Sequence, residues 1–300
     1  MTTNFTFSAE EWSESYDILQ GLFAGRCSPQ STAEKLASLT LSGTPDRTRS
    51  PDDNDYHGID IFPWTAIISA AQDLQSQIPK LVDLMVCMSK LPAPRDPDGK
   101  QVVVYAGRIW DDLPEFGWEA NSIWNSRIIS PKRLWLQLIT IPGRDIPTEP
   151  GAERQTELAR FLNANEFIAR LESTGIRDNK MFALWTFSEA LEIPIDQAVS
   201  QRADLEAAIP AAAIWVQILG PQIFRWTKVF QHGGIHGAPG SGGPLWHGKH
   251  GFCKERWGLW RERFGELSRD SRLSDELREV AAKSENKMAE IEEQEVHGDA

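Results

Sequence analysis

Prolines and glycines divide this chain into segments whose apolar residues recur at helical spacing. Pro63 and Pro79 each begin a segment of this kind, because proline is well tolerated in the first turn of a helix. Val102-Val103-Val104-Tyr105 has the character of a strand, but no second strand is evident to pair with it. The pattern therefore predicts an all-α fold. Besides 63–74 and 79–91, helices are expected at about residues 8–23, 31–41, 152–173, 178–192, 195–208, 211–231, 254–267 and 274–294.

The organisation expected from this pattern is one large multi-helix domain over residues 1–300, a length that suffices to bury a substantial core. No strict repeat period is present, so a helical-repeat arrangement is left open but is not demonstrated. The last helix carries mostly charge, and residues 285–300 are expected to form a mobile tail. Loops rich in proline, glycine or small polar residues are expected at 42–58, 92–101, 142–151 and 232–252.

Two helix starts are predicted from capping boxes, in which a serine is followed three residues later by a glutamate. These are Ser8-Ala9-Glu10-Glu11 and Ser31-Thr32-Ala33-Glu34. Gly25 is expected to end the first of the two helices.

Composition and charge exclude several classes of protein. A net charge of −12 argues against broad non-specific binding of nucleic acid. The three cysteines are far apart and form no CxxC pair, which fits a reducing compartment and argues against a disulfide framework. The sequence shows no secretory signal and no window of the roughly 18 apolar residues that a membrane span needs. A cytoplasmic protein without a membrane segment is expected.

The stretch Trp110-Asp111-Asp112-Leu113-Pro114-Glu115-Phe116-Gly117-Trp118 concentrates three carboxylates between aromatic residues. Burial of neighbouring carboxylates would raise at least one pKa into a range useful for proton transfer. Together the carboxylates could also hold a guanidinium or ammonium group. Alternatively, Asp112 and Glu115 fit a capping box, which leaves Asp111 free. The candidate catalytic residues are therefore Asp111, Asp112 and Glu115, and Trp110 and Trp118 are candidate substrate contacts.

A basic segment at residues 225–263 has a net charge of +5 within an acidic chain. Its tryptophans and basic side chains could stack bases and contact a phosphate backbone. Alternatively, it is a solvated helix face that pairs with the acids of residues 266–300. Its candidate nucleic-acid contacts are Arg225, Lys228, Lys249, Lys254, Arg256, Arg261 and Arg263.

Metal and nucleotide-cofactor sites are not indicated. His232 and His236 are four residues apart, but Gly233 and Gly234 argue against the helix that would align them. HExxH, GxSxG, P-loop and dinucleotide-binding motifs are all missing from the sequence. We expect no metal and no cofactor.

The chain resembles a fungal family long catalogued only as a domain of unknown function. The shared landmarks are Pro63-Trp64, Ile109-Trp110-Asp111-Asp112-Leu113-Pro114, Ala183-Leu184-Trp185, Gly243-Pro244-Leu245-Trp246 and Glu255-Arg256-Trp257. The family includes arginine-containing cyclodipeptide synthases, whose Asp-Asp-x-x-Glu motif matches Asp111-Asp112-Leu113-Pro114-Glu115.

The resemblance implies a tRNA-dependent synthase of fungal secondary metabolism, which joins arginine and a second amino acid into a cyclic dipeptide (2,5-diketopiperazine). Its partners would be arginyl-tRNA and a second aminoacyl-tRNA, with the basic segment at 225–263 against the tRNA backbone. Aminoacyl esters are already activated, so neither ATP nor a metal is required. The motif carboxylates would bind the arginine guanidinium or its ammonium, or act as general base.

Two other functions compete with this interpretation. In one, the protein is a non-catalytic helical scaffold or binding protein, whose carboxylates cap a helix and whose tryptophans form the core. In the other, it is a cofactor-free enzyme or binding protein for an apolar small molecule in a tryptophan-lined pocket.

Overall fold

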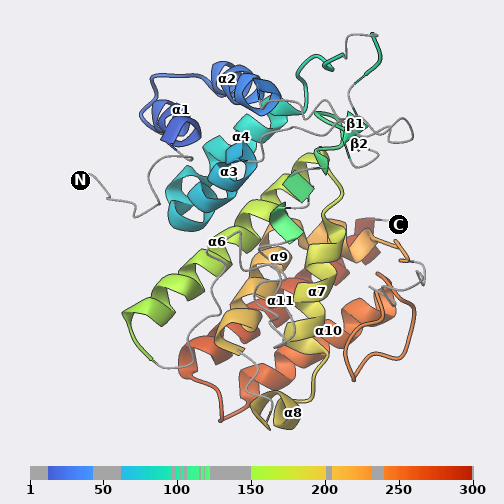
Figure 1. Cartoon of the computed structure of the whole chain (residues 1–300). Helices are drawn as coiled ribbons and strands as arrows, with labels where there is room; N and C mark the ends of the chain where they lie inside the picture. The colour runs from blue at the N-terminus through green and yellow to red at the C-terminus, as the bar shows by residue number, and fades with distance from the viewer. Residues whose placement is uncertain are drawn as a thin grey trace. The chain divides into compact units, whose positions relative to one another are not determined.

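The computed structural model of the chain describes residues 13–42, 62–95, 99–101, 103–104, 107–114, 116–117, 119–121, 150–200, 205–230 and 240–298. It divides into two compact units, an N-terminal unit of residues 1–163 and a C-terminal unit of residues 164–300 (Figure 1). The expectation of one domain over the whole chain stays a prediction. Regular structure in the described residues is helical apart from one short hairpin, so the all-α prediction is confirmed.

The N-terminal unit begins with helices α1 (Ser13–Phe23), α2 (Pro29–Ser42), α3 (Phe62–Asp73) and α4 (Ile78–Met88), with the 3-10 turn η1 (Gln75–Gln77) before α4. Helix α1 ends as expected at Gly25, which adopts a φ of 70° that favours glycine. Helix α2 packs against α1 and α4, and α3 packs against α1, α2 and α4. Leu19, Leu36, Ile67 and Leu81 are fully buried, one from each helix, and form the core of this unit.

A hairpin of two strands, β1 (Val103–Val104) and β2 (Gly107–Arg108), lies later in the N-terminal unit. The strands are antiparallel, with Val103 opposite Arg108 and Val104 opposite Gly107. The sequence therefore located β1 but missed its partner, because β2 has only a glycine and an arginine and no apolar alternation. Residues 114, 116–117 and 119–121, which follow β2, are helical.

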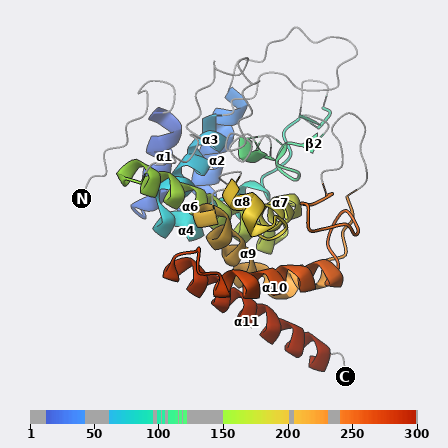
Figure 2. The same cartoon turned by 90° about the horizontal axis from the view of Figure 1, so that it is seen from below.

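The C-terminal unit contains the end of α6 (Ala152–Thr174) and helices α7 (Lys180–Leu191), α8 (Ile195–Ser200), α9 (Leu205–Arg225), α10 (Lys254–Arg269) and α11 (Asp275–Gly298). Helix α9 packs against α7, and α11 packs against both α9 and α10 (Figure 2). The amide oxygen of Asn165, which is fully buried, accepts hydrogen bonds from Trp215 Nε1 at 3.0 Å and from Thr186 Oγ1 at 3.3 Å. This satisfies polar groups of α6, α7 and α9 inside the core.

The expected break at Pro210 is wrong, because α9 runs from Leu205 through both Pro210 and Pro221 to Arg225. Each proline removes one helical N–H and costs about 3 kcal/mol relative to alanine. Helix α9 also buries Ile209, Trp215 and much of its alanine-rich surface. Burial of that apolar surface offsets the two prolines, a tertiary effect that the sequence pattern does not reveal.

Helix α9 is also long and apolar enough to cross a membrane, judged by length and composition alone. Of its most apolar window, 67% is buried within the structure, and a core helix meets the same criterion. This is weak evidence for a membrane span, and the expectation that none exists stays a prediction.

The expected mobile tail at 285–300 is corrected by α11, which continues to Gly298 and buries Met288 and Ile291. A Cβ atom on Gly220 would lie 2.5 Å from Ile291 Cδ1, so the glycine lets α11 approach α9 closely. The predicted loops at 42–58 and 142–151 lie almost wholly outside the described residues. The described parts of 92–101 and 232–252 contain no helix.

Candidate functional site

Asp111 and Asp112 lie in a tight turn between β2 and the helical residues that begin at Pro114. The backbone N–H of Asp112 donates to the carbonyl of Arg108 at 3.0 Å. The backbone N–H of Arg108 in turn donates to Asp112 Oδ2 at 2.8 Å, which closes the turn. Leu113 then adopts a φ of 46°, a left-handed conformation that costs a residue with a Cβ atom about 1–2 kcal/mol. The Leu113 side chain is buried, and backbone strain of this kind is often found at functional sites.

The two aspartates hold one guanidinium between them. Arg108 Nη1 lies 3.0 Å from Asp111 Oδ2. Its Nε and Nη2 each lie 3.2 Å from the oxygens of Asp112, in the paired geometry typical of arginine and carboxylate. The side chains of Arg108, Asp111 and Asp112 are 55%, 39% and 45% exposed. This turn therefore holds the guanidinium of Arg108 on the solvent side of the chain.

The rise in pKa expected from burial of neighbouring carboxylates is not found at Asp112, whose role stays a prediction. Hydrogen bonds from the Arg108 side chain, and then from its backbone N–H, hold the pKa of Asp112 below its ordinary value. A carboxyl with a lowered pKa is ionised at neutral pH and suits the binding of cations better than proton transfer. Glu115, the third motif carboxylate, lies outside the described residues, as does Trp118.

Trp110 points into the core, in contrast to the aspartates that follow it. Its side chain is 2% exposed, and its ring centroid lies 6.2 Å from that of Trp64 on α3. Trp64 in turn lies 6.3 Å from Phe116, edge to face. Trp110 was predicted to contact the substrate, but it is a core residue instead. Its packing against Trp64 fixes the start of the turn.

Glu119 is a fourth carboxyl near this site, and sequence reasoning missed it. It is 7% exposed and makes a side-chain hydrogen bond with Thr65, the residue after Trp64. Burial raises the pKa of Glu119, and the Thr65 hydrogen bond only partly opposes this. In the sequence, only its position directly after the Trp110–Trp118 stretch could have pointed to Glu119 as a site residue. Such spacing does not reveal that the side chain is buried.

In the basic segment, Arg256 is fully buried and cannot contact a nucleic acid. Its guanidinium pairs with the equally buried Glu192, with Nε 2.6 Å from Oε1 and Nη2 2.8 Å from Oε2. Trp260 Nε1 donates to the same carboxylate at 2.7 Å, and the Gly243 N–H donates at 2.8 Å. Ser188 Oγ lies 3.1 Å from Arg256 Nη2.

Two backbone carbonyls complete the surroundings of Arg256. Its Nη1 donates to Gly240 at 3.0 Å and to Gly251 at 2.9 Å, while the rings of Trp246 and Trp260 flank the guanidinium. A buried charge needs this many partners, because an unpaired one would cost several kcal/mol. Arg256 therefore fixes residues 240–251 against α7 and α10, which is a structural role.

Most other basic side chains of this segment pair with acids of the same unit. Arg263 is 9% exposed, pairs with Glu266 and also donates to the carbonyl of Leu191, so its tRNA-binding role is corrected as well. Further pairs join Arg225 to Glu295 at 2.8 Å, Arg261 to Glu292 at 2.6 Å and Lys228 to Asp178. Lys249 and Lys254 are exposed. The alternative of pairing with the acids of residues 266–300 is thus supported for Arg225, Arg261 and Arg263.

Metal ligands are not gathered in the part of the chain that the structure describes, where no three histidine, cysteine or acidic residues meet. His232 and His236 lie outside that part. The expectation of no metal and no cofactor stays a prediction.

Comparison with known proteins identifies one family. A family model described as a protein of unknown function (DUF3632) matches residues 64–264, a span that holds both the aspartate turn and Arg256. No curated protein and no solved structure matches the chain.

Proposed function

The chain belongs to the DUF3632 family of proteins of unknown function, and we propose that it is an arginine-dependent cyclodipeptide synthase that uses aminoacyl-tRNAs. The observation that carries the proposal is the Arg108 guanidinium held by Asp111 and Asp112. Asp111 and Asp112 belong to the motif that the sequence shares with arginine-containing synthases, and paired carboxylates of this kind suit the guanidinium of an arginyl substrate.

Arg108 stands where the substrate guanidinium would bind. An exposed ion pair contributes about 0–1 kcal/mol to stability. Exchange of Arg108 for a substrate arginine would therefore cost little free energy. The pKa of Asp112 lies below its ordinary value, so the carboxylate that would receive the substrate is ionised at neutral pH. Asp111 and Asp112 would thus orient the arginyl group, and Glu115 completes the motif.

The chemistry requires two aminoacyl ends held together. The amine of one attacks the ester carbonyl of the other, so a C–N bond forms and the C–O bond to the tRNA ribose breaks, and a proton passes to the leaving hydroxyl. A second attack of the same kind closes the ring and releases the other tRNA. Of the basic segment, the exposed Lys249 and Lys254 remain available to a tRNA backbone in the cytoplasm.

The proposal is tested by mass spectrometry of extracts from a host that expresses the chain. Wild type should produce a cyclic arginyl dipeptide, and Asp111→Asn/Asp112→Asn should lower its amount at least tenfold. Asp83→Asn is the matched control, since Asp83 is an exposed aspartate of the same unit on α4. Soluble, folded wild type without any cyclic arginyl dipeptide would overturn the proposal.

A non-catalytic binding protein is the second candidate. It is favoured by the pairing of Arg225, Arg261 and Arg263 with acids of the chain itself, which leaves less positive charge for tRNA. Extracts that lack a cyclic arginyl dipeptide for both wild type and the double variant, with both proteins folded, would select this function.

A further inference from the structure

Glu119 is a buried carboxyl that meets no cationic side chain among the residues that the structure describes. Burial raises the pKa of Glu119, and a side-chain hydrogen bond from Thr65 partly opposes this rise. No positive charge among the described residues lowers the pKa further. Its Oε1 atom is buried and has no hydrogen-bond partner in that part of the chain. A carboxylate in such a position is unfavourable until a cation meets it.

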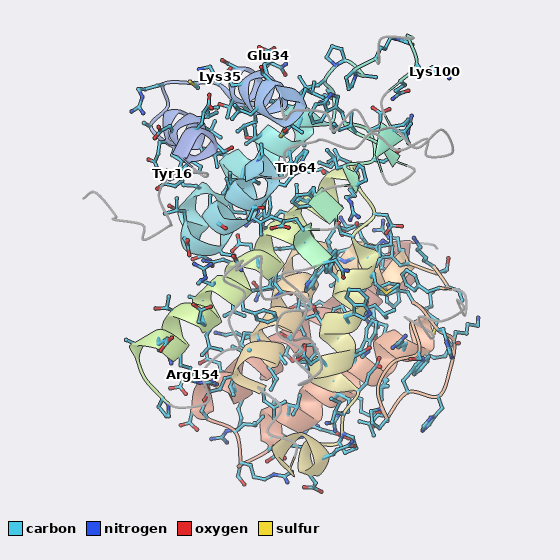
Figure 3. All side chains as sticks on the ribbon, in the orientation of Figure 1. Tyr16, Glu34, Lys35, Trp64, Lys100 and Arg154 are labelled. Atoms are coloured by element: carbon cyan, nitrogen blue, oxygen red, sulfur yellow. The ribbon has the colours of Figure 1, made fainter. Side chains whose placement is uncertain are left out.

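Two other buried polar atoms on α3 are in the same condition. Trp64 Nε1 and Ser69 Oγ are buried, and neither has a partner in the part of the chain that is described. Thr65 and Ser69 are four residues apart and share a helix face, while Trp64 precedes Thr65 directly (Trp64 is labelled in Figure 3). A buried polar atom without a hydrogen bond is unfavourable, and a ligand that bonds to it would relieve this cost.

Aromatic rings pack against Trp64. Phe116 and Glu119 are three residues apart in a helical stretch, so they lie on one face. Phe116 meets the Trp64 ring at 6.3 Å, and Trp110 meets it at 6.2 Å. The faces of aromatic rings attract ammonium groups, and a nearby carboxylate adds to that attraction.

We propose that Glu119, Ser69 and Trp64 form a binding site for a small α-amino ester or α-amino acid, bordered by Phe116. Glu119 Oε1 and Ser69 Oγ accept hydrogen bonds from its ammonium group, and Trp64 Nε1 donates one to its carbonyl oxygen. The protein offers two hydrogen-bond acceptors and one donor. A ligand with an ammonium group next to a carbonyl group can bond to all three. The assignment of the ligand to an arginyl ester rests on the proposed function, in which Asp111 and Asp112 hold its guanidinium.

Binding of two probes to the full chain tests the site by isothermal titration calorimetry. L-arginine methyl ester has a guanidinium, an ammonium and an ester, whereas Nα-acetyl-L-arginine methyl ester lacks the ammonium. Wild type should bind the first at least about tenfold more tightly than the second. Glu119→Gln should remove this preference, while the control Asp83→Asn should retain it.

Equal affinity of wild type for the two esters, or no binding of either, would overturn the site. So would a Glu119→Gln protein that keeps the wild-type preference. The wild-type comparison decides the matter even where the variant does not fold. A preference for the free amine in a protein that makes no cyclic dipeptide would leave the site standing and remove the synthase function.

Discussion

At the level of single residues, the feature that matters most in the aspartate turn is the contact between Arg108 and the Asp112 carboxyl. Its side chain and backbone both hydrogen-bond to Asp112, which lowers the pKa of that carboxyl. Such a group stabilises the fold at pH values above its unfolded pKa, about 4, and this contribution is lost as pH falls through the lowered pKa. Because all the side chains involved are exposed, the contribution itself is small.

Arg108→Ala is expected to return the pKa of Asp112 towards its ordinary value, because both side-chain hydrogen bonds and the positive charge are removed. The free energy of unfolding at pH 7 should change by less than about 1 kcal/mol. Carboxyl NMR titration and urea denaturation measure the two quantities. An unchanged pKa would show that the backbone N–H of residue 108 holds the charge alone.

Glu119→Gln is expected to stabilise the ligand-free protein at pH 7. The pKa of Glu119 is raised by burial, so the folded state favours its protonated form. Below the unfolded pKa of about 4 both states are protonated, and the stability of wild type then declines as pH rises through the raised pKa. The melting temperature of the variant should exceed that of wild type at pH 7, and the gap should close towards pH 4. A gap that is independent of pH, or equal in Asp83→Asn, would contradict this.

At the level of elements, the pair of Glu192 and Arg256 joins three parts of the C-terminal unit. Glu192 follows α7, Arg256 lies in the first turn of α10, and Gly243 belongs to the irregular segment between α9 and α10. A Cβ atom on Gly243 would lie 2.6 Å from the carbonyl oxygen of Glu192, so only glycine permits this approach. The carbonyl of Glu192 also accepts the Leu245 N–H at 2.9 Å. Backbone hydrogen bonds and the Glu192–Arg256 ion pair thus help to hold the described part of the irregular segment.

Arg256→Leu is expected to lower the free energy of unfolding by about 3–5 kcal/mol, because it leaves Glu192 buried without its cation. Urea denaturation measures the loss. Arg269→Leu is the matched control on the same helix, since Arg269 is 69% exposed and lies 3.9 Å from Glu285, and it should cost less than about 1 kcal/mol. Similar losses in the two variants would show that the buried pair has no special role.

At the scale of the whole molecule, the chain has a net charge of −12, and many of its charged side chains form ion pairs with one another. Acids of α11 meet bases of α9 and α10: Glu295 pairs with Arg225, and Glu292 pairs with Arg261 and accepts from Trp257 Nε1 at 2.9 Å. The acidic C-terminal helix is therefore part of the C-terminal unit. The positive surface expected from residues 225–263 is largely neutralised.

Deletion of residues 285–300 is expected to destabilise the protein, because it removes Met288 and Ile291 from the core. Each such side chain contributes about 1.5–3 kcal/mol when buried, so a total loss of about 3–6 kcal/mol should follow. Thermal unfolding of the shortened chain measures it. An unchanged melting temperature would restore the interpretation of these residues as a dispensable tail.

The helices and the aspartate motif were predictable because their signals are local. Helix α6 was expected at 152–173 and is Ala152–Thr174, and α10 was expected at 254–267 and is Lys254–Arg269. The start of α2 was misplaced by two residues: Ser28 Oγ accepts the N–H of Ser31 at 3.1 Å, so Ser28 caps the helix. Several serines near a helix start satisfy the same pattern, and only the backbone geometry selects one of them.

By itself, the sequence determined the all-α class, most helix bounds and the paired carboxylates, since apolar period, proline, glycine and residue type act within a few neighbours. Tertiary structure alone decided that Trp110 is buried while Asp111 faces solvent, that Glu119 is enclosed, and that Arg256 meets Glu192 rather than a ligand. Burial and charge pairing depend on which helix faces meet. Residues 64 positions apart, such as Glu192 and Arg256, find each other only through that packing.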